Sequence, residues 1–454
     1  MSSSPDAPRL AAMEMFRAVR DDQAYANLLM PSLLEKFGLD GRDAAFATEL
    51  AYGSMRMQGL YDAILARCSK RAMADIEPGV HDALILGTHQ LLSMRVPDHA
   101  AVDTSCALVR AVGAHARADL RAGFVNAVLR CVAQRDLDEW LIELGIDDAT
   151  TDAQLAVRYS HPEWIVAAMR AARGERGEVA ALLAADNEAA RPALAVLEGD
   201  RNEVLDQPGV SIGQWSECAV IVDSGVPGLV PAVRAGRAIV QDEGSQLVTQ
   251  ALMLVPVPGP ESAWLDMCAG PGGKARLLYS SRPSRSIHLT ACEMHPHRAE
   301  LVREALLRGN PESGTFEVVV GDARTRPWGN RTFDRILVDA PCTGLGALRR
   351  RPEARWRKSN DDVTELASLQ RGLLNAAIDS LRKEGVVAYV TCSPHLRETV
   401  HIVDDIVMRR DDIELIDARP YLPGVPDLGA GPTVQLWPDV HGTDAMFLAL
   451  IRRV

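Results

Sequence analysis

The sequence predicts a protein of several domains: an all-α N-terminal domain, a small α/β connecting segment and a C-terminal α/β domain. Three observations lead to this fold class. The chain has 454 residues, enough for about two to four domains with cores of their own. Residues 9–133 read as consecutive helices with few strand-like stretches. From Gly236 onward, short apolar segments alternate with helical ones, which indicates a mostly parallel sheet covered by helices.

Composition limits the possible classes of function. Apolar residues make up 47% of the chain, and no apolar run is long enough to cross a bilayer. The N-terminus lacks the layout of a secretory signal, so we expect a cytoplasmic protein without a membrane partner. We also expect a monomer. The net charge of −12 argues against binding nucleic acid by bulk charge alone. None of the eight cysteines forms a Cys-x-x-Cys pair, so no metal site is expected.

The N-terminal half divides into three predicted parts. Residues 1–8 are expected to be disordered, and residues 9–150 form the helical domain, in which Val80, Leu84 and Leu91 share one helical face. Residues 151–235 form a small α/β connecting subdomain. It begins with a helix that follows Pro162, because proline is common at a first helical turn, and it continues into short strands and turns.

The last predicted domain spans residues 236–454 and carries the alternating pattern. Strands are predicted at residues 263–267, 287–292, 316–320, 335–339 and 386–391, with a late pair at 433–437 and 446–451 that can pair antiparallel at the sheet edge. Helices are predicted at residues 274–280, 297–308, 362–383 and 397–409.

A glycine-rich turn follows the first of these strands. Residues 264–274 read WLDMCAGPGGK, and a strand, a glycine-rich turn and a helix together open a crevice for a nucleotide-like cofactor. Ala275 follows Lys274, where a phosphate-binding P-loop needs Ser or Thr, and the dinucleotide pattern Gly-x-Gly-x-x-Gly is absent. A plain structural turn is the competing interpretation.

Acidic residues fall at the carboxyl ends of three successive predicted strands, where open α/β sheets bind ligands: Glu293, Asp322 and Asp339. A carboxylate after the second strand suits a ribose with two free hydroxyls, and Asp322 suits the exocyclic amine of adenine. A single such acid would be read as a surface residue or helix cap. Three of them, without a P-loop, favour a cofactor with adenosine and no phosphate, such as S-adenosylmethionine.

Two cysteines also follow strands on the predicted ligand side. Cys342 lies in Asp-Ala-Pro-Cys-Thr-Gly after the fourth strand, and Cys392 lies in Thr-Cys-Ser-Pro after the fifth. A thiolate there is a strong carbon nucleophile. Methylation at C5 of a pyrimidine needs one, because sulfur addition to C6 makes C5 nucleophilic. Either cysteine alone could be a buried packing residue.

At these residues the sequence resembles a known family. The segments DMCAGPGGK, DAPCTGLGALRRRPEARWR and YVTCSPH resemble the RNA cytosine-C5 methyltransferases of the Sun family. GFVNAVLR resembles the helical NusB-like RNA-binding domain, and SHPEW also resembles the family. The layout is similar to the RsmB/Sun-like enzymes that methylate cytosine 967 of bacterial 16S ribosomal RNA. The resemblance implies a NusB-like N-terminal domain and a Rossmann-like class I methyltransferase domain.

The resemblance also implies roles for individual residues. Cys392 matches the nucleophile, Cys342 matches the residue that assists release of the methylated RNA, and Asp339 is placed to touch the target base. The cofactor, S-adenosyl-L-methionine, would be held by Cys268, Ala269, Gly270, Pro271, Gly272, Gly273, Lys274, Glu293, Asp322 and Asp339.

The sequence departs from the family pattern at three places. Gly270 stands where the family usually has Ala, which a turn should tolerate. Arg397, Glu398 and Thr399 replace a more usual acid-rich run, which leaves the role of that helix start open. Residues 191–200 also match poorly.

A basic stretch is the predicted contact to RNA. Residues 348–358 read LRRRPEARWRK, with six basic residues, one acid and Trp356, which could stack on a base or simply pack. The predicted phosphate-binding residues are Arg349, Arg350, Arg351, Arg355, Arg357 and Lys358.

We therefore expect an S-adenosylmethionine-dependent RNA cytosine-C5 methyltransferase, with 16S ribosomal RNA as the substrate. The target base would have to be exposed or flipped out of its stack. The alternatives are the same chemistry on transfer RNA, or a NusB-like RNA-binding protein without catalysis.

Overall fold

A computed structural model describes residues 5–112, 117–174, 178–308 and 315–454, which fold as two units. Unit 1 takes the chain up to Ala189 together with the segment Leu348–Arg357. Unit 2 takes Ala190–Ala347 and Lys358–Val454. The predicted fold class is confirmed, and the segment Leu348–Arg357 is a feature that the sequence did not indicate.

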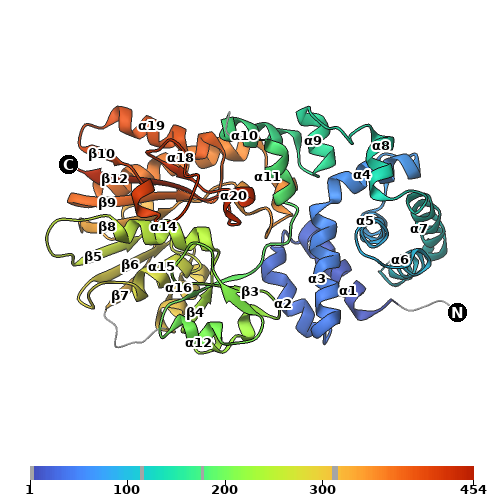
Figure 1. The fold of residues 1–454 in the computed structure, drawn as a ribbon, viewed down its shortest axis with the longest axis horizontal. Coiled ribbons are helices and arrows are strands. Elements are labelled where there is room, and N and C mark those ends of the chain that lie inside the picture. Colours follow the sequence, from blue (N-terminus) through green and yellow to red (C-terminus); the bar gives the residue numbers. More distant parts are fainter. Residues whose placement is uncertain (1–4, 113–116, 175–177, 309–314) are drawn as a thin grey trace. The chain divides into compact units, whose positions relative to one another are not determined.

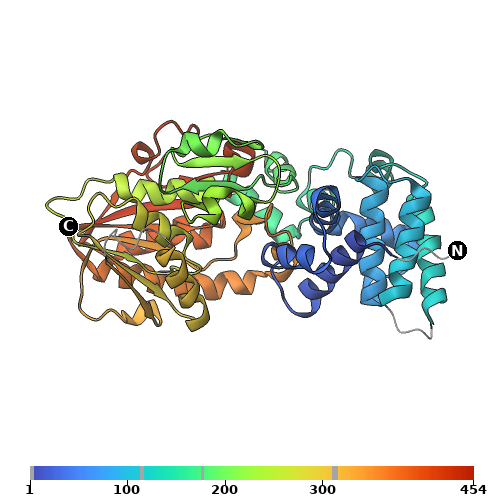
Figure 2. The same cartoon turned by 90° about the horizontal axis from the view of Figure 1, so that it is seen from below.

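Unit 1 is helical, and its described residues contain no strand (Figures 1 and 2). Helix α5 is buried on nearly all sides and packs against α1, α3, α4, α6 and α7, so the core of the unit forms around it. Side-chain caps begin two of the later helices, where Asp136 and Thr151 each form a capping box. The helices are α1 (Ala7–Asp21), α2 (Ala26–Lys36), α3 (Gly41–Arg56), α4 (Gln58–Ser69), α5 (Pro78–Leu92), α6 (Asp98–Val112), α7 (Ala118–Val132), α8 (Leu137–Leu144), α9 (Asp152–Arg158), α10 (Glu163–Arg173) and α11 (Val179–Ala185), with the short α17 (Ala354–Arg357) in the late segment.

The boundaries of the first domain differ from those in the prediction. Residues 1–4 of the expected disordered N-terminus lie outside the described residues, and α1 already begins at Ala7. The predicted connecting subdomain, residues 151–235, divides between the two units. Its helices α9–α11 lie in unit 1, and its strands lie in unit 2.

Unit 2 starts with a small antiparallel sheet in the order β2-β3-β1-β4. It has its own apolar core, which includes Leu194, Val220 and Ala238. Its elements are β1 (Ala193–Val196), α12 (Arg201–Leu205), β2 (Val210–Ile212), β3 (Ala219–Val222), α13 (Pro231–Arg234) and β4 (Ala238–Val240).

The large sheet of unit 2 carries the predicted alternating pattern. Its strands run β10-β12-β9-β8-β5-β6-β7, with β11 paired to β12 (Figure 1). The pairs among β5 to β9 are parallel, and β12 adds antiparallel to β9. The strands are β5 (Ala263–Asp266), β6 (His288–Glu293), β7 (Phe316–Val320), β8 (Phe333–Asp339), β9 (Leu381–Thr391), β10 (Ile413–Ile416), β11 (Val434–Gln435) and β12 (Phe447–Arg453).

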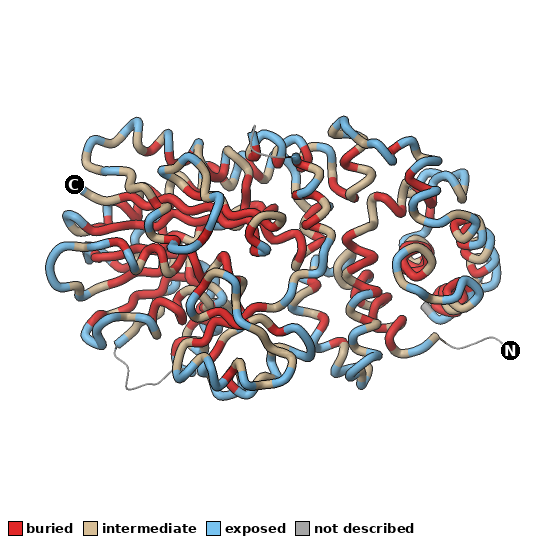
Figure 3. The backbone as a smooth tube through the Cα atoms, viewed as in Figure 1, coloured by how far each residue is buried: buried red, intermediate tan, exposed pale blue. Residues whose placement is uncertain are grey.

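Alternating side chains of these strands build one core on each face of the sheet. Trp264, Leu337 and Val386 pack in one core with helices α14 to α16, and Leu265 and Ile336 pack in the other with α18 and α19. Burial on both faces explains why β5, β6, β8 and β9 read as apolar runs, and Figure 3 shows the middle of the sheet buried, whereas β7 and β10 at its edges are mostly half-buried. The helices are α14 (Glu243–Leu254), α15 (Gly273–Ser280), α16 (Pro296–Leu307), α18 (Asn360–Asp379), α19 (Val400–Arg409) and α20 (Pro438–His441).

The predicted strands and helices of this domain are all present, most of them with shifted ends, whereas helices α14 and α20 and strand β10 were not predicted. The helix expected at residues 362–383 is α18, which ends at Asp379 because β9 starts at Leu381, five residues earlier than predicted. Strand β10 was not predicted, since its four residues IELI lie between charged loops.

Candidate active site

The carboxyl ends of the parallel strands bring the predicted ligand-binding residues to one edge of the sheet. Of these predicted residues, Glu293 ends β6, Asp339 ends β8 and Cys392 follows β9. Asp266, which was not predicted, ends β5 at the same edge. The chain leaves the central strand β5 towards β6 on one side, and β8 and β9 lie on the other. Such a switch in strand order is where open α/β sheets bind ligands.

The glycine-rich turn between β5 and α15 approaches its neighbours closely. Gly272 has φ +112°, a conformation that favours glycine, and a Cβ there would lie 2.8 Å from the Cβ of Ala305. A Cβ on Gly270 would lie 2.1 Å from Glu293 Oε2, which is the end of a flexible side chain. A Cβ at position 270 would also lie 2.9 Å from Arg298 Nη2, so an alanine there requires the side chains of both Glu293 and Arg298 to move.

Lys274 connects the turn to the end of β8. Its ammonium donates to Asp339 Oδ2 at 2.7 Å. Burial alone would lower the pKa of Lys274, but the charge of Asp339 and this hydrogen bond outweigh burial and leave the pKa raised. Lys274 is thus a cation at neutral pH, and Asp339 is held within reach of the turn.

Asp266 is a site residue that the sequence analysis did not select. Its carboxylate is fully buried, and neither oxygen accepts a hydrogen bond of good geometry, although the Cys268 amide faces it. Burial, reinforced by the charge of Asp339, raises the pKa of Asp266 to about 7. A buried acceptor without a donor suits a ligand that brings one. Its place at the end of the strand before the turn was the signal that could have found it.

The two other strand-end acids differ in how they are engaged. Glu293 is buried, accepts from the His295 amide at 3.0 Å and lies 3.7 Å from Arg298 Nη1, while Arg298 also donates to the Gly270 carbonyl at 2.6 Å. Asp322 caps the turn Ala323–Thr325 and pairs with Arg324 at 2.6 Å. Its hydrogen bond to Arg324 lowers its pKa. The cap interpretation thus describes Asp322 in this structure.

The two predicted catalytic cysteines are adjacent. Cys342 Sγ and Cys392 Sγ lie 3.4 Å apart, one in each loop after β8 and β9. The Gly346 amide donates to the Cys392 carbonyl at 2.8 Å, which ties the two loops together. The hydrogen bond to Cys392 and burial raise the pKa of the Cys342 thiol well above its ordinary value. One sulfur can therefore ionise while the other keeps its proton.

The basic stretch is not a single exposed surface. The structure places residues 349–357 in unit 1 and Lys358 in unit 2. Arg349 is mostly buried, and Arg351 lies over the ring of Tyr25 at 5.6 Å. Arg357 donates to the carbonyls of Val19 and Ala24 at 2.6 and 2.7 Å.

Arg355 is the most deeply buried of these residues, with no exposed surface. Its Nη1 donates to the carbonyls of Arg56 and Ser160 at 2.8 and 3.1 Å and to Asn187 Oδ1 at 2.7 Å, and its Nη2 donates to the Asp186 carbonyl at 2.7 Å. Burial lowers its pKa to about 10, which still leaves it charged at neutral pH. These donors are used within unit 1, so we remove Arg355 from the proposed RNA contacts.

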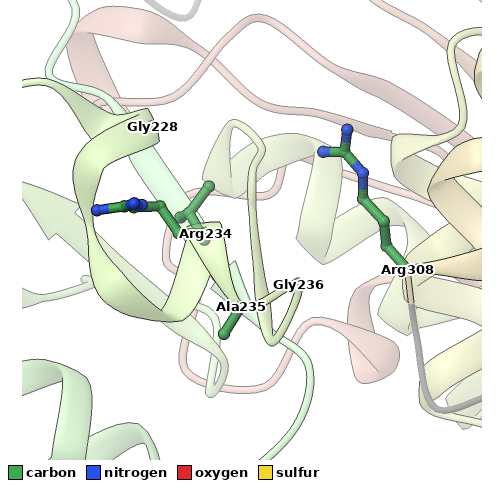
Figure 4. Close-up of a pocket in the computed structure, with 6 residues that line it drawn as sticks. Gly228, Arg234, Ala235, Gly236 and Arg308 are labelled. Atoms are coloured by element: carbon green, nitrogen blue, oxygen red, sulfur yellow. The ribbon is translucent and has the colours of Figure 1, made fainter.

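A cavity of about 510 Å³ lies elsewhere, beside the small sheet of unit 2 (Figure 4). It is lined by Gly228, Val233, Arg234, Ala235, Gly236 and Arg308. The guanidinium groups of Arg234 and Arg308 point in different directions in Figure 4, so they do not converge on one anion. None of the predicted site residues lines this cavity.

Two further features are absent from residues 5–112, 117–174, 178–308 and 315–454. Over these ranges, no cluster of His, Cys, Asp or Glu side chains is arranged to hold a metal ion. No helix in the same ranges combines the length and apolar character needed to cross a bilayer.

Known proteins resemble this chain over its whole length. The model of the NusB family matches residues 6–134, and the model of the 16S rRNA methyltransferase RsmB/F family matches residues 251–452. The ribosomal RNA small subunit methyltransferase B of Pseudomonas syringae pv. tomato is 32% identical over 90% of this chain and 88% of its own length. The chain belongs to the RsmB/F family. RsmB/F enzymes are S-adenosylmethionine-dependent RNA methyltransferases, so the predicted family and cofactor are confirmed.

A second relative and two solved structures extend the comparison. A methyltransferase of Mycobacterium tuberculosis H37Rv is 49% identical to this RsmB/F family member over 99% of this chain and 97% of its own length. The crystal structure of PH0851 superposes with a TM-score of 0.79 at 21% identity, and covers 99% of each chain. A methyltransferase homolog from Pyrococcus horikoshii gives 0.56 at 22% identity over 67% of this chain and all of its own. At these identities the structures show the same fold.

Proposed function

We propose that this RsmB/F family member methylates C5 of a cytosine in 16S ribosomal RNA through a covalent bond between Cys392 and C6 of the base. The observation that carries the proposal is the distance of 3.4 Å between the Cys342 and Cys392 sulfurs, at the strand ends that also carry the cofactor turn. An RNA methyltransferase that attacks a nitrogen or an oxygen needs no such pair of thiols.

The chemistry divides between the two sulfurs. The Cys392 thiolate adds to C6, its electron pair forms the S–C6 bond, and the ring electrons move towards C5. S-adenosylmethionine, when bound, would supply an electrophilic methyl group: the C5 electron pair would form the C5–CH3 bond, and the S–CH3 bond would break so that S-adenosylhomocysteine leaves. The C5 proton then leaves to water, the C5=C6 bond re-forms and the S–C6 electron pair returns to Cys392. Cys342 donates its proton to the departing sulfur, which suits a thiol whose pKa is raised.

The cofactor would be held by the strand-end acids and the turn. The buried Asp266 carboxylate fits the ammonium group of the methionine part, because it lacks a donor of its own. Glu293 would accept from the ribose hydroxyls, and Asp322 from the adenine amine after it releases Arg324. The turn from Cys268 to Lys274 would line the same crevice, and Asp339 would contact the target base beside Lys274.

Ribosomal RNA is favoured as the substrate by the curated relatives that are named as small-subunit rRNA methyltransferases. The NusB-family match at residues 6–134 also supports an RNA substrate, because the resemblance implies that this helical domain binds RNA. We further propose that the enzyme acts as a monomer in the cytoplasm, where its RNA substrate is found.

A trapping experiment tests the chemistry. RNA that contains 5-fluorocytosine should form a stable complex with the wild-type enzyme, because fluorine at C5 cannot leave as a proton. Cys392→Ala should form no complex and lose methylation by many orders of magnitude, since C5 is never activated. Cys342→Ala should accumulate a covalent complex on ordinary RNA, visible as a slowly migrating band on a denaturing gel. If Cys392→Ala traps RNA and Cys342→Ala does not, the two roles are inverted.

Bisulfite sequencing tests the substrate. A deletion strain should lose one 5-methylcytosine from 16S ribosomal RNA and keep those in transfer RNA. Loss from transfer RNA alone would instead support the same chemistry on that substrate.

A further inference from the structure

Glu398 accepts hydrogen bonds from both cysteine loops. It belongs to the segment whose role the family resemblance left open. It ends the turn Leu396–Glu398 before α19, and its side chain has no exposed surface. A buried carboxylate requires several donors to replace its hydration. The identity of those donors shows what Glu398 holds.

The donors to Glu398 come from the residues that follow each cysteine. The Thr343 amide donates to Oε1 at 2.8 Å, and the Thr343 hydroxyl donates to Oε2. The Ser393 hydroxyl donates to Oε2 at 2.7 Å. Because Thr343 follows Cys342 and Ser393 follows Cys392, one carboxylate links both loops at the residue next to the sulfur.

A third element completes this arrangement. Gln370, fully buried on α18, donates to the carbonyl of Pro341 at 2.8 Å and to Glu398 Oε1 at 3.3 Å. The Tyr389 hydroxyl donates to the backbone carbonyl of Glu398 at 2.8 Å. Cys342 is therefore fixed on both sides, through Pro341 and Thr343, by contacts that lead to Glu398.

Different charged groups act on the two sulfurs. The negative charge of Glu398 acts on Cys342 and contributes to its raised pKa. Cys392, in contrast, interacts with the ammonium of Lys274. The same ammonium donates a hydrogen bond to Asp339. Tyr389 and His395 also interact with the charge of Glu398, and Arg371, Arg397 and His401 act in turn on those two groups.

We propose that Glu398 is a positioning residue that holds the two cysteine loops together and keeps the proton shared by the two sulfurs on Cys342. The proton stays on Cys342 Sγ in the resting enzyme, which leaves the electron pair of Cys392 Sγ free to form the bond to C6. This inference rests on the covalent chemistry proposed above. It states that the charge of Glu398, rather than the distance of each sulfur from the base, decides which cysteine attacks C6.

The test compares the alkylation of the two cysteines in the free enzyme. Iodoacetamide reacts with thiolates, and peptide mass spectrometry reports the rate at Cys342 and at Cys392 separately as the pH is varied. In the wild type, Cys392 should react first and Cys342 only at higher pH. Glu398→Gln keeps the shape and removes the charge, so the preference for Cys392 should fall by about tenfold, the change produced by one pKa unit.

Two control variants separate charge from mere support. Glu398→Asp keeps the charge, and Ser393→Ala removes one donor without changing the charge at Glu398. Both should slow methylation yet keep the wild-type alkylation preference. If Glu398→Gln folds poorly, these two variants still test the proposal. Loss of the preferential alkylation of Cys392 in Ser393→Ala would show that the charge of Glu398 does not set the preference.

An unchanged preference and an unchanged pH profile in folded Glu398→Gln would overturn the proposal. The failure of the covalent mechanism is a separate result. It would appear as a wild-type enzyme that does not trap RNA at Cys392, whereas the alkylation experiment needs no RNA.

Discussion

Lys274 and Arg355 are both cations with little or no exposed surface, but their partners differ. Lys274 in unit 2 pairs with one carboxylate, Asp339, at 2.7 Å. Arg355 in unit 1 donates to four neutral oxygens, three of them backbone carbonyls, although the charge of Asp186 also acts on it. A carboxylate can exchange a cation for a ligand, whereas a backbone carbonyl left without its donor has no substitute. The type of partner, more than burial, separates a site residue from one that supports the fold.

Arg355→Ala should have the largest effect, and the effect should be on stability. Removal of the guanidinium leaves buried carbonyls without donors, and we expect a loss of about 3–5 kcal/mol in the free energy of unfolding. Urea denaturation of Arg355→Ala and of Arg355→Lys measures it. Lysine keeps the charge but lacks the planar fork, so it should rescue only part of the loss. A variant as stable as the wild type would contradict the support role.

Lys274→Met should affect activity more than stability. It removes the charge that holds Asp339 at the end of β8, so kcat should fall at least about 100-fold, as when one preorganised donor is lost from an active site. Single-turnover methylation and urea denaturation should be measured on the same preparation. If Lys274→Met destabilises the protein as much as Arg355→Ala, the distinction by type of partner fails.

Glu293→Ala tests a looser ion pair than that of Lys274 and Asp339, because Glu293 lies 3.7 Å from Arg298 Nη1. S-adenosylmethionine binding should weaken by roughly 1.5–3 kcal/mol, the range for a hydrogen bond to a charged group. Titration calorimetry provides the value. Glu300→Ala is the exposed control, because Glu300 lies on α16, the helix that also carries Arg298. Unchanged affinity would remove Glu293 from the cofactor site.

The raised pKa of Asp266, about 7, predicts a pH dependence of cofactor binding. Below pH 7 the buried carboxyl holds a proton that must leave before it can accept from an ammonium group. Binding should therefore tighten as the pH rises, by about tenfold from pH 6 to pH 8, and release a proton near pH 6. Calorimetry in buffers of different ionisation enthalpy detects this proton, and its persistence in Asp266→Asn would exclude Asp266 as the source.

Charge removal at Arg349, Arg350 and Arg351 should have the smallest effect. Because fewer counterions would be released, the salt dependence of RNA binding should flatten by about 0.7–0.9 in slope for each lost phosphate contact. Lys383→Ala is the control, because Lys383 is an exposed cation near the start of β9, at the end of the strand away from Cys392. A triple variant with the wild-type slope would show that these residues support unit 1, as Arg355 does.

The sequence predicted the catalytic unit more completely than the helical unit, for a physical reason. Parallel strands place their carboxyl ends together, so Glu293, Asp339, Cys342 and Cys392 could be grouped from strand positions alone. Helical periodicity identifies a buried face but not the neighbour that covers it. The basic stretch therefore looked like a surface, and the burial of Arg355 depends on carbonyls about 170 to 300 positions away in the chain.

Two site residues escaped for a related reason. Asp266 directly precedes the glycine-rich segment in the sequence, but whether it has a donor depends on three-dimensional packing. Glu398 matched no expected pattern, and its importance appears only when Thr343, Gln370 and Ser393 are seen to donate to it.

The path of the chain limits how the protein can be divided. The chain passes from one unit to the other after Ala189, returns at Leu348 and leaves again after Arg357. A fragment that ends at Ala189 would lack Arg355, and its carbonyls at Arg56, Ser160 and Asp186 would lose their donor. Expression of the two halves as separate proteins is therefore expected to yield an unstable helical half. Any exchange of this half between relatives would have to carry the ten-residue segment with it.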